Sequence, residues 1–438
     1  MPAKTACSSY FQLPNISRRG FLQAGALGGL GISLPGILRS EALAMGTSIA
    51  PKAKSVILLW LQGGVSHHDT FDPKPYAPSS IRGELNTIQT TLPGVNFTEH
   101  LPKLARMTDQ LAIIRSVTHT ESAHQRGSMY MVEGRRPPKA TGVNASGYPE
   151  LGSIVAHELG MRSGLPGFVS IPGNDFTSRF TGSGYLPPSV EAFRGTESNS
   201  LKPDQRVTMD RFAERVELQR SLCQKSATTA APWDTFNEQA IEIISTGKGA
   251  AAFDWQQESK ATQERYGILP GRSGQMGQLT LTARRLIEAG VRYVTVGRNS
   301  WDHHSNIFPL LKDRVPRVDD AMSGLVQDLQ ERNLLDETLV ICMTEYGRTP
   351  KINSQAGRDH WPNAFSILFA GAGIKTGQVI GASDKDGAAV QDRPVSPEEI
   401  AATILHLTGI NPHHEYMTQD GRPIMYVDYA QPIAELLS

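Results

Sequence analysis

Cysteine is scarce in this chain, with three among 438 residues, and the scarcity excludes several kinds of structure. Cys7 lies in the N-terminal segment, which leaves Cys223 and Cys342, and Cys342 falls inside an apolar run that we expect to be a buried strand. A disulfide framework is therefore not expected. The sequence also has no CxxC motif and no Cys/His zinc pattern, so a metal site built on thiolates is excluded.

Net charge is absent as well. Lys plus Arg and Asp plus Glu number 43 each, so no overall field attracts nucleic acid or an anionic membrane. The one glycine-rich, mildly apolar stretch near the N-terminus, residues 24–38, is interrupted by glycine and proline and is too short for a stable transmembrane helix. We therefore expect neither a nucleic-acid partner nor a stable membrane span.

The N-terminus carries an export signal. Residues 17–22 read Ser-Arg-Arg-Gly-Phe-Leu, the pattern of a twin-arginine signal, and Ala42–Ala44 form an A-x-A cleavage site after the apolar stretch. We predict that residues 1–44 are a signal peptide and that the mature protein is periplasmic or extracellular. The remaining residues, 45–438, are enough for a large core.

Apolar, β-branched runs alternate with segments of helical periodicity along the mature chain. Strands are expected at 55–61, 111–117, 291–296, 338–343 and 365–370, and helices at 278–289, 317–332 and 396–407. This alternation predicts an α/β protein, a mainly parallel sheet with helices on both faces. Between about 140 and 270 the periodicity is weak at first and then becomes helical and highly charged, which predicts loops followed by a helical insertion in a single α/β domain.

Polar segments follow two of the predicted strands. Thr344–Pro350, Thr-Glu-Tyr-Gly-Arg-Thr-Pro, comes after one, and Trp301–Asn306, Trp-Asp-His-His-Ser-Asn, after another. In open α/β sheets the carboxyl ends of strands form the ligand site. Asp302 and His304 are two residues apart, so both side chains point the same way from an extended segment, whereas His303 faces the other way.

These segments predict a metal site. The candidate ligands are Asp302, His304, Glu345 and His360, with Asp69 in the loop after the first strand as a further candidate. Carboxylate and imidazole donors together suit Zn²⁺, Mn²⁺ or Mg²⁺. The alternative is structural: the histidines bond to loop carbonyls, and the carboxylates pair with Arg348 or Arg358.

At these residues the chain resembles a known family. The twin-arginine signal, Asp69–Pro75 (Asp-Thr-Phe-Asp-Pro-Lys-Pro), Trp-Asp-x-His, Thr-Glu-Tyr-Gly-Arg-Thr-Pro and Gly357–Pro362 (Gly-Arg-Asp-His-Trp-Pro) together resemble the secreted domain-of-unknown-function 1501 family. That family is similar to the alkaline phosphatase and sulfatase superfamily. The resemblance implies a three-layer α/β/α sandwich that binds one or two divalent metals. Thr344–Gly347 resembles the metal-binding turn of that superfamily.

The chain also departs from the superfamily pattern. No Cys/Ser-x-Pro-x-Arg motif occurs, so a formylglycine sulfatase is excluded, and alignment on Gly134 places His124 at the nucleophile position. The first predicted strand ends in Gln62-Gly63, where the superfamily usually has a metal-binding aspartate.

Two functional classes fit the sequence. The first is an exported metal-dependent hydrolase of a phosphate, sulfate or related ester, with a small or polymeric anionic substrate. In that enzyme His124 would act as general acid/base or as an unusual nucleophile, and Arg348 and Arg358 would stabilise the anionic transition state. The second is a secreted binding or structural protein on the same fold without turnover.

Overall fold

A computed structural model describes residues 49–138, 147–173, 181–195, 207–223, 241, 248–271, 273–298, 300–418 and 421–437. The chain divides into residues 1–49 and 50–438, and the fold described here belongs to the second unit. The predicted signal peptide lies outside the described residues. Among the helices in the described ranges, none is long and apolar enough to span a membrane.

One eight-stranded sheet forms the centre of the fold, in the order β12-β4-β11-β8-β1-β7-β5-β6. Its strands are β1 (Ser55–Leu61), β4 (Ala112–Val117), β5 (Phe168–Ile171), β6 (Phe193–Arg194), β7 (Tyr293–Arg298), β8 (Thr338–Met343), β11 (Phe365–Gly371) and β12 (Gln378–Ile380). All neighbouring pairs are parallel except the two that involve β11, which runs antiparallel to β4 and β8. The five predicted strands and the mainly parallel sheet are confirmed.

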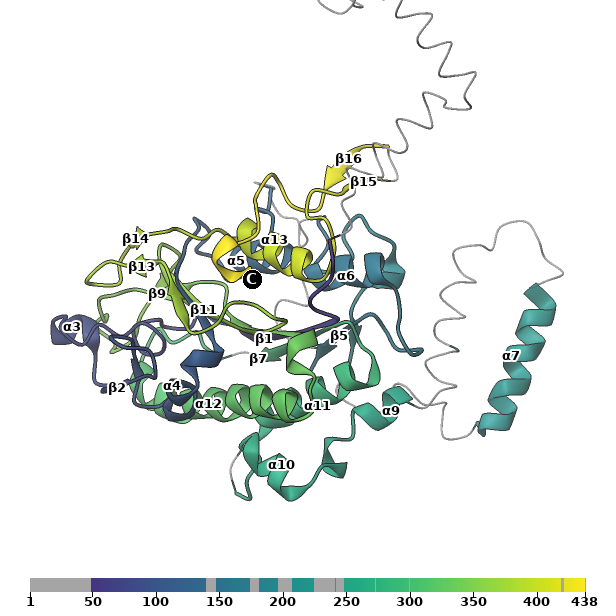
Figure 1. The fold of residues 1–438 in the computed structure, drawn as a ribbon, viewed down its shortest axis with the longest axis horizontal. Coiled ribbons are helices and arrows are strands. Elements are labelled where there is room, and N and C mark those ends of the chain that lie inside the picture. The colour runs from purple at the N-terminus through teal and green to yellow at the C-terminus, as the bar shows by residue number, and fades with distance from the viewer. Residues whose placement is uncertain are drawn as a thin grey trace, which may run out of the picture. The chain divides into compact units, whose positions relative to one another are not determined.

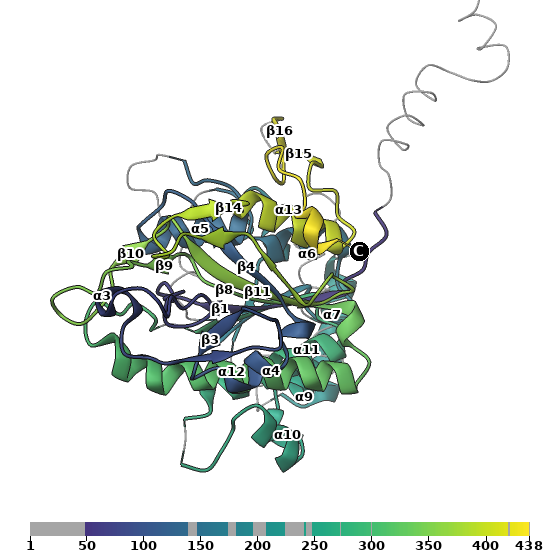
Figure 2. The ribbon, with the colours of Figure 1, turned by 60° about the vertical axis from the view of Figure 1, so that its left-hand side comes forward.

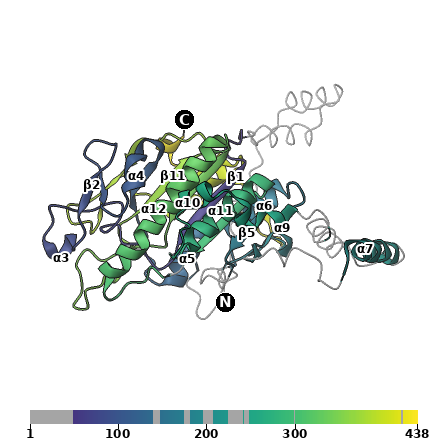
Figure 3. The same ribbon diagram turned by 90° about the horizontal axis from the view of Figure 1, so that it is seen from below.

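Helices cover both faces of the sheet (Figures 1 and 2). One layer holds α5 (His124–Glu133), α6 (Leu151–Leu159) and α13 (Pro397–Leu407), and the other holds α4 (Pro102–Arg106), α11 (Gln275–Ala289) and α12 (Ile307–Glu331). Figure 3 shows α11 and α12 lying across the sheet in the second layer. Alternate residues of β1 enter two separate hydrophobic cores: Ile57 and Leu59 pack in one, Val56 and Leu58 in the other. The three-layer α/β/α architecture is therefore confirmed.

The structure confirms one predicted helix start and corrects another. Ser396 caps α13, and the side chain of Glu399 bonds back to the Ser396 backbone in a capping box, as the acidic first turn indicates. Helix α12, predicted to begin at residue 317, begins at Ile307 instead. It continues through Pro316, a residue that usually marks a helix start because it lacks an N–H donor.

The segment predicted as loops and a helical insertion is partly regular. Helix α6, β5 and β6 lie within its first part, and both strands extend the sheet beyond β7. The second part contains α7 (Met209–Cys223), α9 (Lys248–Ala252) and α10 (Lys260–Arg265). Strand β5 has four residues and β6 has two, too short to give a clear alternation in the sequence.

The fold also contains a short α-helix and short strands outside the layers described above. They are α3 (Ser79–Arg82), β2 (Thr87–Gln89), β3 (Asn96–Thr98), β9 (Gly347–Arg348), β10 (His360–Trp361), β13 (Ala382–Ser383), β14 (Val390–Asp392), β15 (Glu415–Met417) and β16 (Pro423–Met425). The antiparallel pair of β9 and β10 sets His360 opposite Arg348. This pair joins the two motifs that follow β8 into one unit.

Candidate metal centre

The ends of three parallel strands bring the predicted site segments together. Strand β1 lies between β7 and β8, with Leu61 opposite Arg298 and Trp60 opposite Met343. The segments that continue from these strands therefore leave the sheet at one edge, which is the binding edge of open α/β sheets. Asp302 follows β7 and Glu345 follows β8, so both carboxylates lie at that edge.

Four polar side chains converge there: His124, Asp302, His304 and His360. His304 Nε2 lies 2.9 Å from Asp302 Oδ1 and 3.0 Å from His360 Nε2. His360 Nε2 lies 3.1 Å from the same carboxylate oxygen, and His124 Nε2 lies 3.1 Å from Asp302 Oδ2. Three imidazole nitrogens therefore surround one carboxylate, and we call these four residues the histidine cluster.

Each histidine of the cluster is held from outside through its other ring nitrogen. Nδ1 of His124 lies 2.6 Å from Glu345 Oε1, Nδ1 of His304 lies 2.7 Å from Asp359 Oδ1, and Nδ1 of His360 lies 2.7 Å from the carbonyl of Ser122. Carboxylates and carbonyls only accept hydrogen bonds, so Nδ1 is the protonated nitrogen in each ring. Each Nε2 therefore faces inward, where it donates an N–H to Asp302 in a protonated ring or offers a lone pair to a bound cation.

The electrostatics of the cluster favour a positive charge at its centre. Burial lowers the pKa of His124, but the carboxylates of Asp302 and Glu345 outweigh it and raise the pKa to about 9. Burial also opposes ionisation of Asp302, yet its contacts with His124, His360 and Arg348 hold the pKa of this carboxyl far below its usual range. His304 likewise lowers the pKa of Asp359.

Glu345 supports the cluster from a fully buried position. Its Oε1 accepts a hydrogen bond from Gly63 N at 2.8 Å as well as the contact from His124, and its Oε2 accepts from the Thr344 hydroxyl at 3.1 Å. The structure thus places Glu345 behind His124, as an orienting carboxylate, whereas the sequence had grouped it with the ligands. Histidine ligands of metals commonly have such a carboxylate partner.

Gly63 explains how the site is built without an aspartate at the end of β1. Its φ is +123°, and a Cβ at this position would lie 2.4 Å from the backbone nitrogen of Asp302. Only glycine permits this approach of the β1 end to the Asp302 segment. The amide of Gly63 also donates a hydrogen bond to Glu345. At the end of β1, a backbone N–H therefore contacts the site where the superfamily usually has an aspartate side chain.

Arg348 holds the carboxylate of Asp302 in place through an ion pair. Its guanidinium is fully buried, and Nη2 lies 2.5 Å from Asp302 Oδ1. The remaining bonds go to backbone carbonyls: Nε donates to Gly64 at 2.9 Å, and Nη1 donates to Arg358 at 3.0 Å. Arg348 therefore positions a cluster residue and anchors the surrounding loops.

Asp69 and Arg358 form a separate ion pair. Arg358 Nε lies 2.8 Å from Asp69 Oδ2 and Nη2 lies 3.2 Å from Oδ1, and both side chains are fully buried. The other N–H groups of Arg358 donate to the carbonyls of Thr349, Pro350 and Ile81. This guanidinium has no free donor for a substrate, and Asp69 has no contact with the histidine cluster. Asp69 is thus paired with Arg358, as in the alternative in which carboxylates pair with arginines instead of binding a metal.

Three supporting side chains were not singled out from the sequence. The Tyr346 hydroxyl lies 2.7 Å from His124 Nδ1, His119 Nε2 bonds to the carbonyl of Glu345 at 2.6 Å, and Asp359 holds His304. Tyr346 and Asp359 are each adjacent to a predicted site residue within the quoted motifs. The sequence shows that these residues lie next to candidate site residues. It does not show their contacts with His124 and His304, which form only when the loops fold.

The cluster has the donor set of a divalent metal site. Three imidazole nitrogens and one carboxylate are the ligand types that Zn²⁺ and related cations take. In the described residues, the inward atoms of His124, Asp302 and His360 lie within 4.8 Å of one another. The cluster is also open to solvent, because the side chains of Asp302 and His304 are 42% and 44% exposed. A cation and a further ligand can both reach it.

Comparison with solved structures shows low-identity similarity to the alkaline phosphatase and sulfatase superfamily. The lipoteichoic acid synthase LtaP of Listeria monocytogenes has 10% identity, with 87% of this chain and 76% of that one covered at a TM-score of 0.42. The phosphonate monoester hydrolase of Agrobacterium radiobacter has 11% identity, with coverages of 87% and 77% and a TM-score of 0.37.

A sulfatase from Pseudoalteromonas sp. has 12% identity, with coverages of 82% and 68% and a TM-score of 0.37. Among curated proteins none matches. A family model does match nearly the whole domain, over residues 53–437. The chain therefore belongs to the family described as protein of unknown function DUF1501.

Proposed function

We propose that this protein is an exported metal-dependent hydrolase of a phosphate, sulfate or related ester. The observation that carries the proposal is the orientation of the three cluster histidines. Each ring is locked through Nδ1, and each turns Nε2 toward Asp302. Without a metal, each Nε2 can approach the acceptor-only carboxylate of Asp302 only as a protonated donor, and a bound cation takes the place of those protons.

His124, Asp302, His304 and His360 would hold the metal. A divalent cation supplies Lewis acidity at such a site, by which an ester oxygen is polarised or water is activated. Glu345 and Asp359 keep two of the rings in the required tautomer, and Arg348 fixes the carboxylate of Asp302. We assign His124 to the ligands because its Nε2 faces Asp302 beside the ring nitrogens of His304 and His360; the acid/base or nucleophilic role expected from the sequence would use the same nitrogen.

Exposure of the cluster favours catalysis over a structural metal. Structural zinc sites are closed off from solvent inside the fold, whereas catalytic sites keep a position open to substrate. The side chains of His124 and His360 are each 23% exposed, and those of Asp302 and His304 are more exposed still. A substrate can therefore reach the same point as the metal.

Metal analysis of the mature protein tests the proposal. We expect stoichiometric metal in the wild type, loss of metal and of ester hydrolysis in H304A and H360A, and no additive loss in the double variant, because one missing ligand already opens the site. H303Q is the matched control, since His303 is the next residue along but bonds to Arg314, 2.5 Å from its Nε2. Generic phosphate, phosphonate and sulfate esters serve as substrates.

Two results would reject the hydrolase. A wild type without bound metal removes its basis. Full metal in the wild type with no turnover of any ester class would instead indicate a secreted binding protein on this fold.

Export through the twin-arginine route is part of the proposal and rests on residues 17–22 and 42–44. Replacing Arg18 and Arg19 together with lysine should leave the precursor in the cytoplasm, because the exporter recognises the paired arginines. Cell fractionation measures the result. A mature form outside the inner membrane in the doubly substituted strain would show that another route is used.

A further inference from the structure

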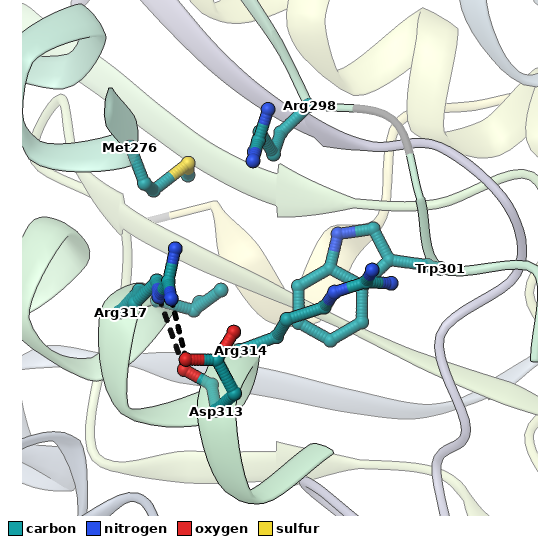
Figure 4. A pocket seen from close by; sticks show the side chains of 7 residues that line it. Met276, Arg298, Trp301, Asp313, Arg314 and Arg317 are labelled. Carbon is teal, nitrogen blue, oxygen red and sulfur yellow. Dashed lines mark hydrogen bonds and ion pairs between the residues drawn. The ribbon is translucent and has the colours of Figure 1, made fainter. Parts of the chain in front are cut away.

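A second polar pocket lies beside the histidine cluster, at the end of β7. It encloses about 120 Å³ between β7, α11 and α12, enough for several water molecules or one small oxyanion (Figure 4). The residues lining it are Met276, Arg298, Trp301, Asp313, Arg314, Arg317 and Val318. Three of these seven are arginines, and one is an acid.

The positive charges of this pocket are incompletely balanced. Asp313 pairs with Arg317, as the dashed lines in Figure 4 show. Arg298 donates to the neutral amide oxygen of Gln275 at 2.7 Å, and Arg314 lies 2.5 Å from the imidazole of His303. Among the described residues, no carboxylate lies within ion-pair distance of Arg298 or Arg314. Burial and the neighbouring arginines lower the pKa of both guanidinium groups.

Trp301 adds an unpaired donor. Its side chain lines the pocket and the residue is only 3% exposed, yet its indole Nε1 is buried without a hydrogen-bond partner among the described residues. Figure 4 shows the indole nitrogen on the side of the ring toward Arg298. A buried N–H without an acceptor costs free energy, so native structures rarely keep one. The pocket therefore contains a buried donor without an acceptor, and its one carboxylate is already paired with Arg317.

We propose that this pocket binds an oxyanion, the phosphate or sulfate group of a ligand. Guanidinium groups bind such groups through paired hydrogen bonds, and an indole N–H supplies a further donor. Arg298 and Arg314 provide the charge, and Trp301 provides the neutral donor. The proposal holds whether or not the histidine cluster hydrolyses esters, because the two sites share no side chain.

NMR of the indole N–H groups reports directly on the pocket. The chain has five tryptophans, so protein labelled with ¹⁵N at the indole gives few signals, and W301F assigns that of Trp301. Titration with sodium sulfate or phosphate, at constant ionic strength, should shift the Trp301 signal saturably. The same shift should appear in H360A, which separates this pocket from the histidine cluster.

Charge variants test which residues bind the anion. R298Q/R314Q should weaken binding about tenfold or more, since both unbalanced charges are removed. K312Q is the matched control: it removes one charge from the same helix, but Lys312 does not line the pocket. An unchanged affinity in R298Q/R314Q overturns the proposal. If that variant does not fold, the wild type still decides, because a Trp301 signal that stays fixed at about 50 mM sulfate and phosphate also overturns it.

Ligands of different size distinguish a free ion from an oxyanion that is part of a larger molecule. Glucose 6-phosphate and glucose 6-sulfate carry the same groups on a larger molecule. Tighter binding of the sugar esters than of the inorganic ions assigns the pocket to a substituent of a larger ligand. Equal or weaker binding assigns it to the free ion, and failure of both classes to shift Trp301 rejects the site.

Discussion

Two aspartate–arginine pairs lie at the binding edge of this fold, and they differ in the exposure and surroundings of the aspartate. Asp302 pairs with Arg348, is 42% exposed at its side chain, and is surrounded by three imidazole nitrogens. Asp69 pairs with Arg358, is fully buried, and receives its only other side-chain bond from the hydroxyl of Ser66 among the described residues.

The comparison shows what separates a candidate site from a structural support. The Asp69 pair is saturated: every donor of Arg358 has an acceptor, and solvent is excluded. The Asp302 pair leaves the Nε2 atoms of three histidines facing a solvent-exposed space. Both aspartates were candidate ligands in the sequence, so exposure and unsatisfied donor atoms, rather than residue type, distinguish them.

The largest expected effect is on the buried pair. D69N should destabilise the protein by about 3–5 kcal/mol, because it leaves the charge of Arg358 buried without its partner. Urea unfolding measures the loss, and the metal content of the folded fraction should not change. E337Q is the control: it breaks the exposed pair with Lys54 and should cost less than about 1 kcal/mol. A D69N variant as stable as E337Q would refute the contrast between the two aspartates.

The loop of the buried pair should also make the protein sensitive to acid. Burial lowers the pKa of His67 to about 4 from 6.5, and burial also holds the pKa of His68 well below its usual value. The neutral forms are therefore favoured by folding. The stability they contribute is complete above pH 6.5 and is lost as pH falls toward 4, by about 3 kcal/mol for His67. H67Q should show a shallower decline across this range in urea unfolding at stepped pH. An identical decline would exclude His67 as the cause.

Glu345 tests the outer layer of the open cluster. E345Q keeps the shape and an acceptor for Nδ1 of His124 but removes the charge. Loss of such a partner lowers metal affinity about 10- to 100-fold. Competition with a chelator measures the affinity. Complete loss of metal would instead show that Glu345 is a direct ligand, as the sequence alone predicts.

The smallest expected effect is on the stability of the open pair. In metal-free protein, D302N should lower the free energy of unfolding by less than D69N does, because solvent reaches the Asp302 position and partly compensates the buried charge of Arg348. The same variant should bind no metal. A loss of stability as large as that of D69N would show that the Asp302–Arg348 pair stabilises the fold as much as the buried pair does.

The sequence predicted the sheet better than the site. Long apolar strands such as 55–61 and 338–343 are visible because burial on both faces gives continuous hydrophobic runs. The pairing of Asp302 with His304 also followed from the alternation of an extended segment. The separation of Asp69 from the cluster did not, since it depends on which arginine each aspartate meets after folding. The sequence of β11 also contains no local feature from which its antiparallel direction could be predicted.

The alternation of side-chain direction along residues 301–304 limits which insertions and deletions this segment can accept during evolution. Trp301 and His303 face the arginine pocket, whereas Asp302 and His304 face the histidine cluster. Inserting or deleting one residue ahead of Trp301 would exchange the two sets and place indole against the carboxylates. Substitutions can alter one face at a time, but a change in length of one residue alters both. We therefore expect related sequences to keep a constant spacing from β7 to His304, even where the neighbouring loops vary in length.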